Sequence, residues 1–273
     1  MVSHKSHWDA QSYDQVSRLV QYRWGQEVLK WRNWKGNETV MDAGCGSGLL
    51  TKLLAQKVPK GKVYGVDIDY NMIEQAKKNL KDLENVELVL SNFSDVKLPT
   101  KFDVIFSNAS LHWVRNHAKV FRHFWNMLKS RSTNRGQLLI QCGGHGNLKR
   151  TILVLRRVME FNEFKEYFTN MNQSWYFAKP DDTRKLLRKI GYVNSKVYLH
   201  NDHVIMTNRK VYSRLVKTVI MKPFLECLPD DDKLQNRYLN SFLYEVERKS
   251  ANRSQNPFWV LDYVRLNIIA DKL

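Results

Sequence analysis

The sequence predicts an α/β fold in which a mostly parallel sheet carries a nucleotide-binding turn. An apolar run at 39–41 has the length of a short buried strand, and the stretch 42–48 that follows it is rich in glycine. Leucines then recur at helical spacing, and a second apolar run at 62–66 ends in an acid, Asp67. Strand, glycine turn, helix, strand and acid in this order are typical of a βαβ nucleotide-binding unit.

The turn after the first strand has the pattern Asp-x-Gly-x-Gly-x-Gly, formed by Asp42, Gly44, Gly46 and Gly48. Such a turn needs glycine because its backbone takes positive φ and approaches a ligand without Cβ atoms in the way. The pattern differs from the dinucleotide fingerprint Gly-x-Gly-x-x-Gly, and no Gly-Lys-Ser/Thr follows it as in a phosphate-binding loop. Cys45 lies inside the turn, where a small side chain suits the space, and we expect no nucleophilic role for it.

The second strand decides between two interpretations of this turn. Asp67 ends that strand 19 residues after Gly48. An acid at this place in a βαβ unit accepts hydrogen bonds from ribose hydroxyls. The alternative is a generic α/β turn followed by a surface acid. The intervals between turn, helix and acid favour the nucleotide site.

The elements of the first half follow from apolar periodicity and turn residues. Aromatic and aliphatic residues recur at steps of three and four over 8–34, which predicts an N-terminal helical region. A helix over 69–80 is expected to begin at Asp69 or Asn71 as its N-cap. The complete series comprises strands at 38–43, 62–67, 86–90 and 102–107, with helices at 48–57, 69–80 and 117–129.

The second half predicts more helix than strand. A long helical stretch is expected over 148–171, and a helix over 181–190 ends at Gly191, which suits a C-cap. Two further helices fall between the last strands. The complete series comprises a strand at 137–141, helices at 148–171 and 181–190, a strand at 193–199, helices at 209–228 and 231–250, and a final strand at 257–270.

Four stretches together resemble the class I S-adenosylmethionine-dependent methyltransferases: Val40–Gly48, Val63–Asp69, the segment around Asn92, and Phe102–Val114. The Ser-Asn-Ala-Ser-Leu-His-Trp stretch at 107–113 is similar to the branch that holds trans-aconitate, malonyl-carrier-protein and juvenile hormone acid methyltransferases. The resemblance covers residues 8 to 145 well, and beyond them it rests on the layout and on the Asp-Tyr-Val-Arg-Leu ending.

The resemblance implies a Rossmann-like seven-stranded sheet, mostly parallel with an antiparallel last strand, and a helical cap. It implies S-adenosylmethionine as the cofactor. We expect a core with an N-terminal lid helix over 1–145. Helical cap segments over 146–273 are interleaved with the last strands of the same sheet, so that the chain forms a single domain overall.

The resemblance also implies roles for single residues. Asp42 and the turn would hold the methionine end of the cofactor, and Asp67 would hold the ribose. An aromatic residue matching Tyr13 helps to close the pocket, although core packing explains Tyr13 equally well. Asn92 stands where the family commonly has an aspartate, and its carbonyl oxygen could still accept from the adenine amino group. The expected cofactor set is Tyr13, Asp42, Gly44, Cys45, Gly46, Gly48, Asp67, Ile68, Asn92, Phe93 and Asn108.

His112 is the candidate catalytic residue, because it follows the fourth strand at the edge where α/β sheets bind ligands. A neutral histidine could accept a proton there, and a charged one could pair with a substrate carboxylate. Orientation of the substrate is the favoured role. The structural alternative is a histidine packed beneath Trp113.

Composition limits the classes of protein. Lys and Arg number 44 against 27 acids, a net charge of +17, but no block of five like charges occurs. A basic solvated surface explains this charge, and binding of nucleic acid is the alternative. Neither a run of eighteen apolar residues nor an apolar signal core is present, so we expect a cytoplasmic protein without a membrane span. The three cysteines show no metal-binding spacing, and no metal is expected.

The favoured function is O-methylation of a small-molecule carboxylic acid. A carboxylate acceptor is already anionic and needs no general base. The alternatives are an RNA or protein methyltransferase that uses the basic surface, and a non-catalytic protein that binds S-adenosylmethionine.

Overall fold

A computed structural model of the chain describes residues 13–14, 20–130, 135–171, 175–206, 208–251 and 259–273. The chain divides into two compact units. The core unit comprises residues 1–145, 175–200 and 265–273, and the helical unit comprises 146–174 and 201–264. The expected boundary at 145 and the single-domain arrangement stay predictions.

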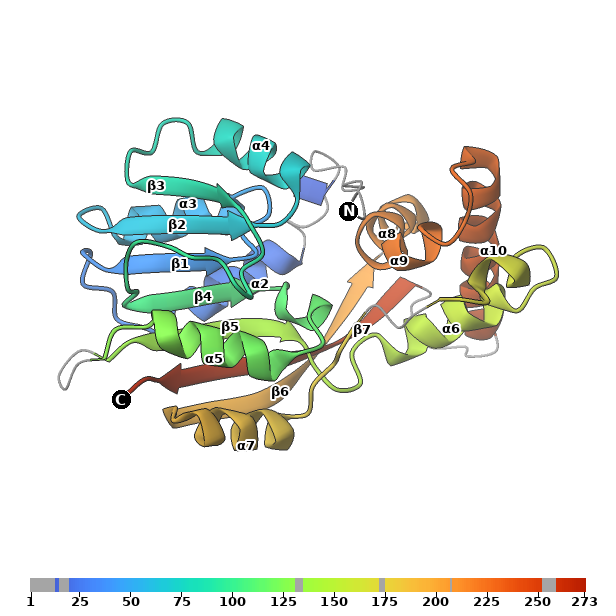
Figure 1. Cartoon of the computed structure of the whole chain (residues 1–273). Coiled ribbons are helices and arrows are strands. Elements are labelled where there is room, and N and C mark those ends of the chain that lie inside the picture. The colour runs from blue at the N-terminus through green and yellow to red at the C-terminus, as the bar shows by residue number, and fades with distance from the viewer. Residues whose placement is uncertain (1–12, 15–19, 131–134, 172–174, 207, 252–258) are drawn as a thin grey trace. The chain divides into compact units, whose positions relative to one another are not determined.

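One seven-stranded sheet runs through the fold, in the order β3-β2-β1-β4-β5-β7-β6. Neighbours from β3 to β5 pair in parallel, and β7 pairs antiparallel to β5 (Figure 1). This confirms the predicted sheet with an antiparallel last strand. The strands are β1 (Thr39–Ala43), β2 (Lys62–Asp67), β3 (Val86–Leu90), β4 (Val104–Asn108), β5 (Gln137–Gly143), β6 (Val193–Met206) and β7 (Trp259–Asp271).

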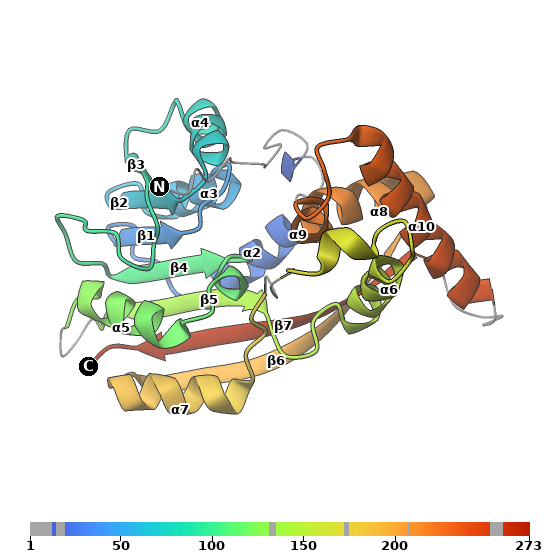
Figure 2. The same ribbon diagram turned by 45° about the vertical axis from the view of Figure 1, so that its right-hand side comes forward.

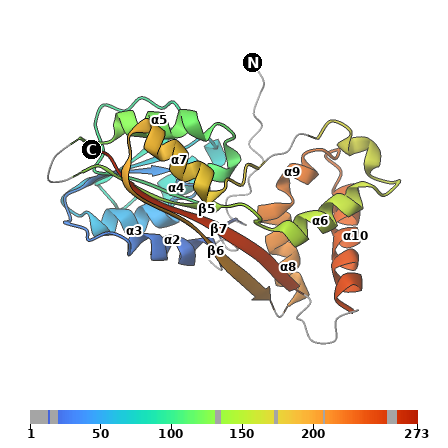
Figure 3. The same ribbon diagram turned by 90° about the horizontal axis from the view of Figure 1, so that it is seen from below.

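Helices cover both faces of the sheet in the core unit (Figure 3). On one face α2 (Gln21–Leu29) and α3 (Leu49–Lys57) bury Val28 and Leu54 against alternate residues of β1, β4 and β5. On the other face α5 (His117–Met127) and α7 (Pro180–Ile190) bury Phe124 and Leu187. A sheet covered on both faces explains why its parallel strands are apolar throughout rather than alternating.

The carboxyl ends of β1, β4 and β5 meet at one edge of the sheet (Figure 2). Apart from Tyr13, each ligand-binding candidate of the sequence stands in or after β1 or β4, at the end of β2, or in the turn after β2 or β3. Helix α4 (Tyr70–Asn79) also begins at this edge, with Asp69 as its N-cap, where the carboxylate accepts from Met72 N–H at 3.0 Å. The fold therefore gathers the predicted residues at one place.

The helical unit differs from the long helices expected of it. The stretch predicted at 148–171 breaks into α6 (Lys149–Met159) and the 3-10 turn η2 (Lys165–Phe168). The stretch at 209–228 is α8 (Arg209–Leu215), the π-helical η3 (Val216–Ile220) and α9 (Lys222–Leu225), and α10 (Asp232–Ala251) follows. Apolar periodicity continued through these breaks because Phe164, Phe168 and Phe224 pack with Tyr238 in one aromatic cluster.

Two other differences concern lengths. β6 extends to Met206 rather than ending at 199, and the alternation of exposed and less exposed residues is interrupted at 200–201 and then resumes to Met206. In the N-terminal region the described helix is α2, and part of the helical region expected over 8–34 lies outside the described residues. No helix in the described part of the chain is long and apolar enough to cross a membrane.

Candidate active site

The glycine-rich turn joins β1 to α3 and takes a left-handed backbone at three glycines. φ is 78° at Gly44, 54° at Gly46 and 83° at Gly48. A Cβ at Gly48 would come within 2.6 Å of Leu80, so this glycine permits close packing between elements. Among the described residues, a Cβ at Gly46 would meet only the Met72 sulfur, at 4.0 Å. The side of Gly46 is therefore open towards a ligand.

Asp67 holds this turn in place. Its Oδ2 accepts from the Gly46 N–H at 2.8 Å and its Oδ1 accepts from the Asp69 N–H at 2.9 Å. Burial raises the pKa of the Asp67 carboxyl, and these backbone donors oppose that shift. Each carboxylate oxygen has a second lone pair, so the residue can bind the turn and a ligand hydroxyl together.

Asp42 lies beneath the turn and is 2% exposed. Its Oδ2 accepts from the Thr51 hydroxyl at 2.7 Å. Burial raises the pKa of Asp42 to about 7, with a smaller contribution from the charge of Asp67. A carboxyl group that is half-protonated at neutral pH changes its charge readily when a cation arrives. Cys45 beside it is buried too, and burial raises the pKa of its thiol, so it stays protonated.

Two serines tie β4 to the same turn. Ser107 Oγ donates to the Ala43 carbonyl at 2.7 Å, and Ser110 Oγ donates to the Gly44 carbonyl at 3.1 Å. Between them Ala109 has a φ of 56°, an uncommon conformation for a residue with a Cβ atom. Backbone strain of this kind clusters at functional sites, where the surrounding contacts hold it.

Three residues of the expected cofactor set, among them the adenine candidates Asn92 and Phe93, follow β2 and β3. The Ile68 side chain is 61% exposed, which leaves an apolar surface beside Asp67. Phe93 is half-buried, with its ring centroid 6.1 Å from that of Phe124. Asn92 Oδ1 accepts from the Ser94 N–H at 2.9 Å. Asn92 is thus already engaged, and one lone pair of this oxygen is left for the expected adenine contact.

The N-terminal segment contacts the turn through Tyr13 and Asp14. The Tyr13 hydroxyl donates to Gln21 Oε1, and the Ser47 hydroxyl of the turn donates to Asp14. Asn79 Nδ2 also donates to Asp14, at 3.1 Å. Burial raises the pKa of Tyr13, and the nearby charge of Asp67 adds to the shift. Tyr13 therefore lies near the ribose candidate.

Asn108, at the end of β4, presents an acceptor without a hydrogen-bond partner. The residue is 8% exposed and its Nδ2 donates to the Gln21 carbonyl at 3.1 Å. Its Oδ1 is buried and accepts no hydrogen bond from the described residues. A buried acceptor without a donor costs free energy, so this oxygen favours a ligand that carries a donor group.

His112 lies in the short 3-10 turn η1 (Leu111–Trp113) after β4. Its Nδ1 accepts from the Gly143 N–H at 3.2 Å. Burial lowers the pKa of His112 to about 3, and the charges of His117 and Arg265 contribute. The imidazole is therefore neutral, and because Nδ1 is an acceptor its one proton is assigned to Nε2. The ring also packs against Trp113 and Phe177, at centroid distances of 5.5 and 6.1 Å.

Sequence reasoning missed the polar residues that β7 brings to this edge. Arg265 and Asn267 lie on one face of β7, in a largely apolar part of the strand, and are nearly fully buried. Asn267 Oδ1 accepts from Gln141 Nε2 at 2.6 Å, and the Arg265 guanidinium stacks on Trp24. Two polar residues at a spacing of two in a buried strand were the signal that pointed to them.

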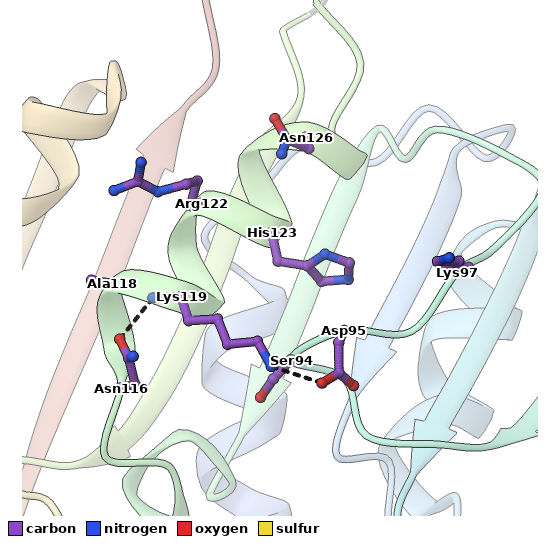
Figure 4. A pocket seen from close by; sticks show the side chains of 9 residues that line it. All are labelled: Ser94, Asp95, Lys97, Asn116, Ala118, Lys119, Arg122, His123 and Asn126. Carbon is purple, nitrogen blue, oxygen red and sulfur yellow. Dashed lines mark hydrogen bonds and ion pairs between the residues drawn. The ribbon is translucent and has the colours of Figure 1, made fainter.

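A separate hollow of about 550 Å³ lies beside α5 (Figure 4). It is lined by residues after β3 and on the outer side of α5, where Lys119 pairs with Asp95 at 2.7 Å. None of the predicted site residues lines it. We therefore place the candidate active site at the glycine-rich turn and not in this hollow.

Comparisons with known proteins show the family of the chain. A family model described as "Methyltransferase domain" matches residues 35–218, more than half of the chain. A Schizosaccharomyces pombe protein described as an uncharacterized methyltransferase is 24% identical over 98% of this chain and 99% of its own length. The juvenile hormone acid O-methyltransferase of Drosophila melanogaster is 24% identical over 84% of this chain and 77% of its own length.

A solved structure shows the same fold. Phosphoethanolamine N-methyltransferase 2 of Haemonchus contortus, in complex with S-adenosyl-L-methionine, aligns with a TM-score of 0.60 and 17% identity. The alignment covers 96% of this chain and 56% of that one. Sheet order, glycine-rich turn and family match agree, and the chain belongs to the class I S-adenosylmethionine-dependent methyltransferases.

Proposed function

We propose that this methyltransferase methylates the carboxylate of a small organic acid. The observation that carries the proposal is the state of His112. It is a neutral imidazole whose Nδ1 is engaged by the Gly143 N–H. With its proton on Nε2 it is a hydrogen-bond donor, and it lacks a free lone pair that could remove a proton from an acceptor.

A site that offers a hydrogen-bond donor and no general base suits a methyl acceptor that is already a nucleophile. A carboxylate is ionised at neutral pH, so methyl transfer to it needs orientation and exclusion of water rather than proton removal. Burial also raises the pKa of the neighbouring Cys142 thiol to about 12, so this group is protonated at neutral pH. An alcohol or ammonium acceptor would need a base, which these residues do not supply.

The residues at the turn fit the cofactor on two observations. The open side of Gly46 leaves room for a ligand against the backbone, and Asn108 Oδ1 offers a buried acceptor for its ammonium group. When bound, S-adenosylmethionine supplies an activated methyl group on a sulfonium cation. In the proposal Asp42 balances the positive charge of the methionine end, because a buried carboxyl with a pKa of about 7 ionises readily beside a cation.

The remaining cofactor roles follow from position. Asp67 binds the ribose hydroxyls with the lone pairs that its backbone donors leave free. The exposed face of Ile68 packs on the adenine, with Phe93 and Asn92 at the opposite margin. Tyr13 closes the site over the ribose. Gly44, Cys45 and Gly48 shape the turn without contributing side-chain chemistry.

The Drosophila relative supports the acceptor class by its printed name, which is that of an acid O-methyltransferase. A malonyl-carrier-protein O-methyltransferase of Ilyobacter polytropus shares 25% identity over 44% of this chain. Identity at this level supports a carboxyl acceptor as a class and leaves the particular acid open. The acceptor must therefore be found by experiment.

The test is methyl transfer to matched acceptors that differ only in the reacting group. Decanoic acid, decanol, decylamine and decanamide, together with trans-aconitic acid and bulk transfer RNA, would be incubated with methyl-labelled S-adenosylmethionine. We expect label in the acids alone, released as methanol by mild alkali because the product is an ester. Label that resists alkali, or that enters only the amine, the alcohol or RNA, would contradict the proposal.

A further inference from the structure

Arg265 stands opposite Gly143 in the antiparallel pair of β5 and β7. The N–H of that same glycine donates to His112 Nδ1, so one residue pair links the arginine to the candidate catalytic turn. Arg265 is 3% exposed although its side chain keeps its charge under all ordinary conditions. A buried, permanent cation is thus held at the carboxyl end of the sheet.

Trp24 fixes the position of this cation. The guanidinium carbon of Arg265, in the middle of β7, lies 3.2 Å from the centroid of the ring of Trp24, a residue of α2. Stacking of a planar guanidinium on an aromatic face restrains the side chain while leaving the in-plane N–H donors able to bind. The same helix accepts a hydrogen bond from Asn108 through the Gln21 carbonyl, so α2 is anchored to this edge.

The surroundings of Arg265 on its face of the sheet are polar and small. Residues alternate between faces along a strand, so Arg265 shares a face with Asn267, and Gly143 opposite it has no side chain. Gln141, opposite Asn267, has an Oε1 that is buried and accepts no hydrogen bond from the described residues. Polar groups collected in this way favour a polar ligand over an apolar one.

We propose that Arg265 is the residue that recognises the acceptor carboxylate, gripping one end of it while the Nε2–H of His112 donates to the other. The inference rests on the proposed function, since it assigns the anion that function requires. The charge of Arg265 also contributes to lowering the pKa of His112, after burial and the charge of His117. An anion beside a buried guanidinium gains more than at a surface, because the effective dielectric constant is lower.

The competing explanation is that Arg265 only packs against Trp24 and supports the sheet. The two explanations differ in one measurable respect. If Arg265 recognises the carboxylate, its loss weakens binding of the charged acceptor and leaves binding of the neutral methyl ester unchanged. If its role is structural, its loss weakens binding of acid, ester and cofactor equally.

The experiment compares R265Q and R265K with R122Q, which removes one exposed cation from the outer side of α5. The probe is whichever acid of the matched panel the wild type methylates, together with its methyl ester. For R265Q we expect the KM of the acid to rise by roughly 30-fold, the effect of removing one partner from a buried charge pair. The affinities for the methyl ester and for S-adenosylmethionine should change by less than about threefold, as should every constant of R122Q.

R265K keeps the charge and loses the planar fork, and we expect a smaller rise in KM than for R265Q. If R265Q does not fold, R265K still carries the test through its ratio of acid to ester affinity. An unchanged KM for the acid, or an equal loss for acid, ester and cofactor, would overturn the inference and leave the proposed function standing. A wild type that methylates none of the acids would overturn both.

Discussion

The two ends of the site edge differ in charge. At the cofactor end, after β1 and β2, the buried or half-buried charged groups are carboxyls, Asp42 and Asp67. At the proposed acceptor end, after β4 and on β7, the buried charged group is the cation of Arg265, and the neutral imidazole of His112 stands near it as a hydrogen-bond donor. This difference explains how one edge of the sheet could hold two ligands in contact. The carboxyls of the cofactor end favour a sulfonium cation, and the cation of the acceptor end favours a carboxylate.

Gly46→Val should break the cofactor end with the largest effect. The side of Gly46 is open in this structure, so the added carbons would occupy space meant for the ligand. We expect the affinity for S-adenosylmethionine to fall by more than about 100-fold, about 2.7 kcal/mol. Calorimetric titration of the folded variant measures this. Gly36→Val is the matched control, because Gly36 also has a positive φ of 88°, lies outside the turn, and would bring a Cβ only into ordinary contact with Pro59 at 3.7 Å.

Asp67→Ala tests the second carboxylate of that end. Loss of its hydrogen bonds should weaken the binding of S-adenosylmethionine by roughly 1.5–3 kcal/mol, the range for hydrogen bonds to a charged group. Asp67→Asn should lose less, because its amide oxygen can still accept from one backbone donor. Binding of wild-type strength in the alanine variant would show that the ribose does not contact Asp67.

His112→Ala tests the acceptor end. We expect turnover to fall by about 10- to 100-fold, where each tenfold loss corresponds to about 1.36 kcal/mol of activation free energy. The affinity for S-adenosylmethionine should stay nearly constant. His112→Gln should recover part of the rate, since glutamine can donate a hydrogen bond. The melting temperature separates this from simple destabilisation. A large loss of thermal stability together with normal turnover at low temperature would assign His112 to the core instead.

Asp42→Asn gives the smallest effect and the clearest dependence on pH. In the wild type the affinity for S-adenosylmethionine should fall as pH drops below about 7, towards the roughly tenfold weaker affinity of D42N, because protonated Asp42 no longer balances the cation. In D42N the affinity should be weaker and independent of pH. Titrations between pH 5.5 and pH 8 measure both curves, and equal slopes for the two proteins would contradict the assignment.

The same substitution predicts a change in stability of known sign. The pKa of Asp42 is raised to about 7 in the folded state from 3.8, so folding disfavours its ionised form. The wild type is therefore relatively most stable below about pH 4 and loses that advantage as pH rises through 7. D42N should melt at a higher temperature than the wild type at pH 8, and the difference should disappear near pH 4. A difference of the opposite sign would show that Asp42 is ionised in the apoprotein.

The two ends also differ in how far the sequence predicted them. The turn and Asp67 occupy one short stretch whose glycines and acids need a particular backbone, so spacing alone indicated them. The proposed acceptor end consists of Trp24, His112, Gly143 and Arg265, which lie on four different elements and meet only through tertiary packing and the pairing of β5 with β7. Spacing along the chain carries no information about such a meeting, and only the position of His112 after the fourth strand was predicted.

Helix breaks were the other feature beyond prediction. Apolar periodicity over 148–171 was correct for the buried side chains and wrong for the backbone, because the tertiary aromatic cluster around Tyr238 accepts residues from both a helix and a 3-10 turn. Side-chain burial reports which residues face inward, and it does not distinguish a continuous helix from a broken one.

The most direct test of the division of charge is a crossed binding measurement on D42N and R265Q. Calorimetry at pH 8 would give the affinity of each variant for S-adenosylmethionine, and for the acid in the presence of saturating S-adenosylhomocysteine. For D42N we predict an affinity for the cofactor about tenfold weaker and an unchanged affinity for the acid. For R265Q we predict an affinity for the acid roughly 30-fold weaker and an unchanged affinity for the cofactor. Equal losses for both ligands in both variants would contradict it.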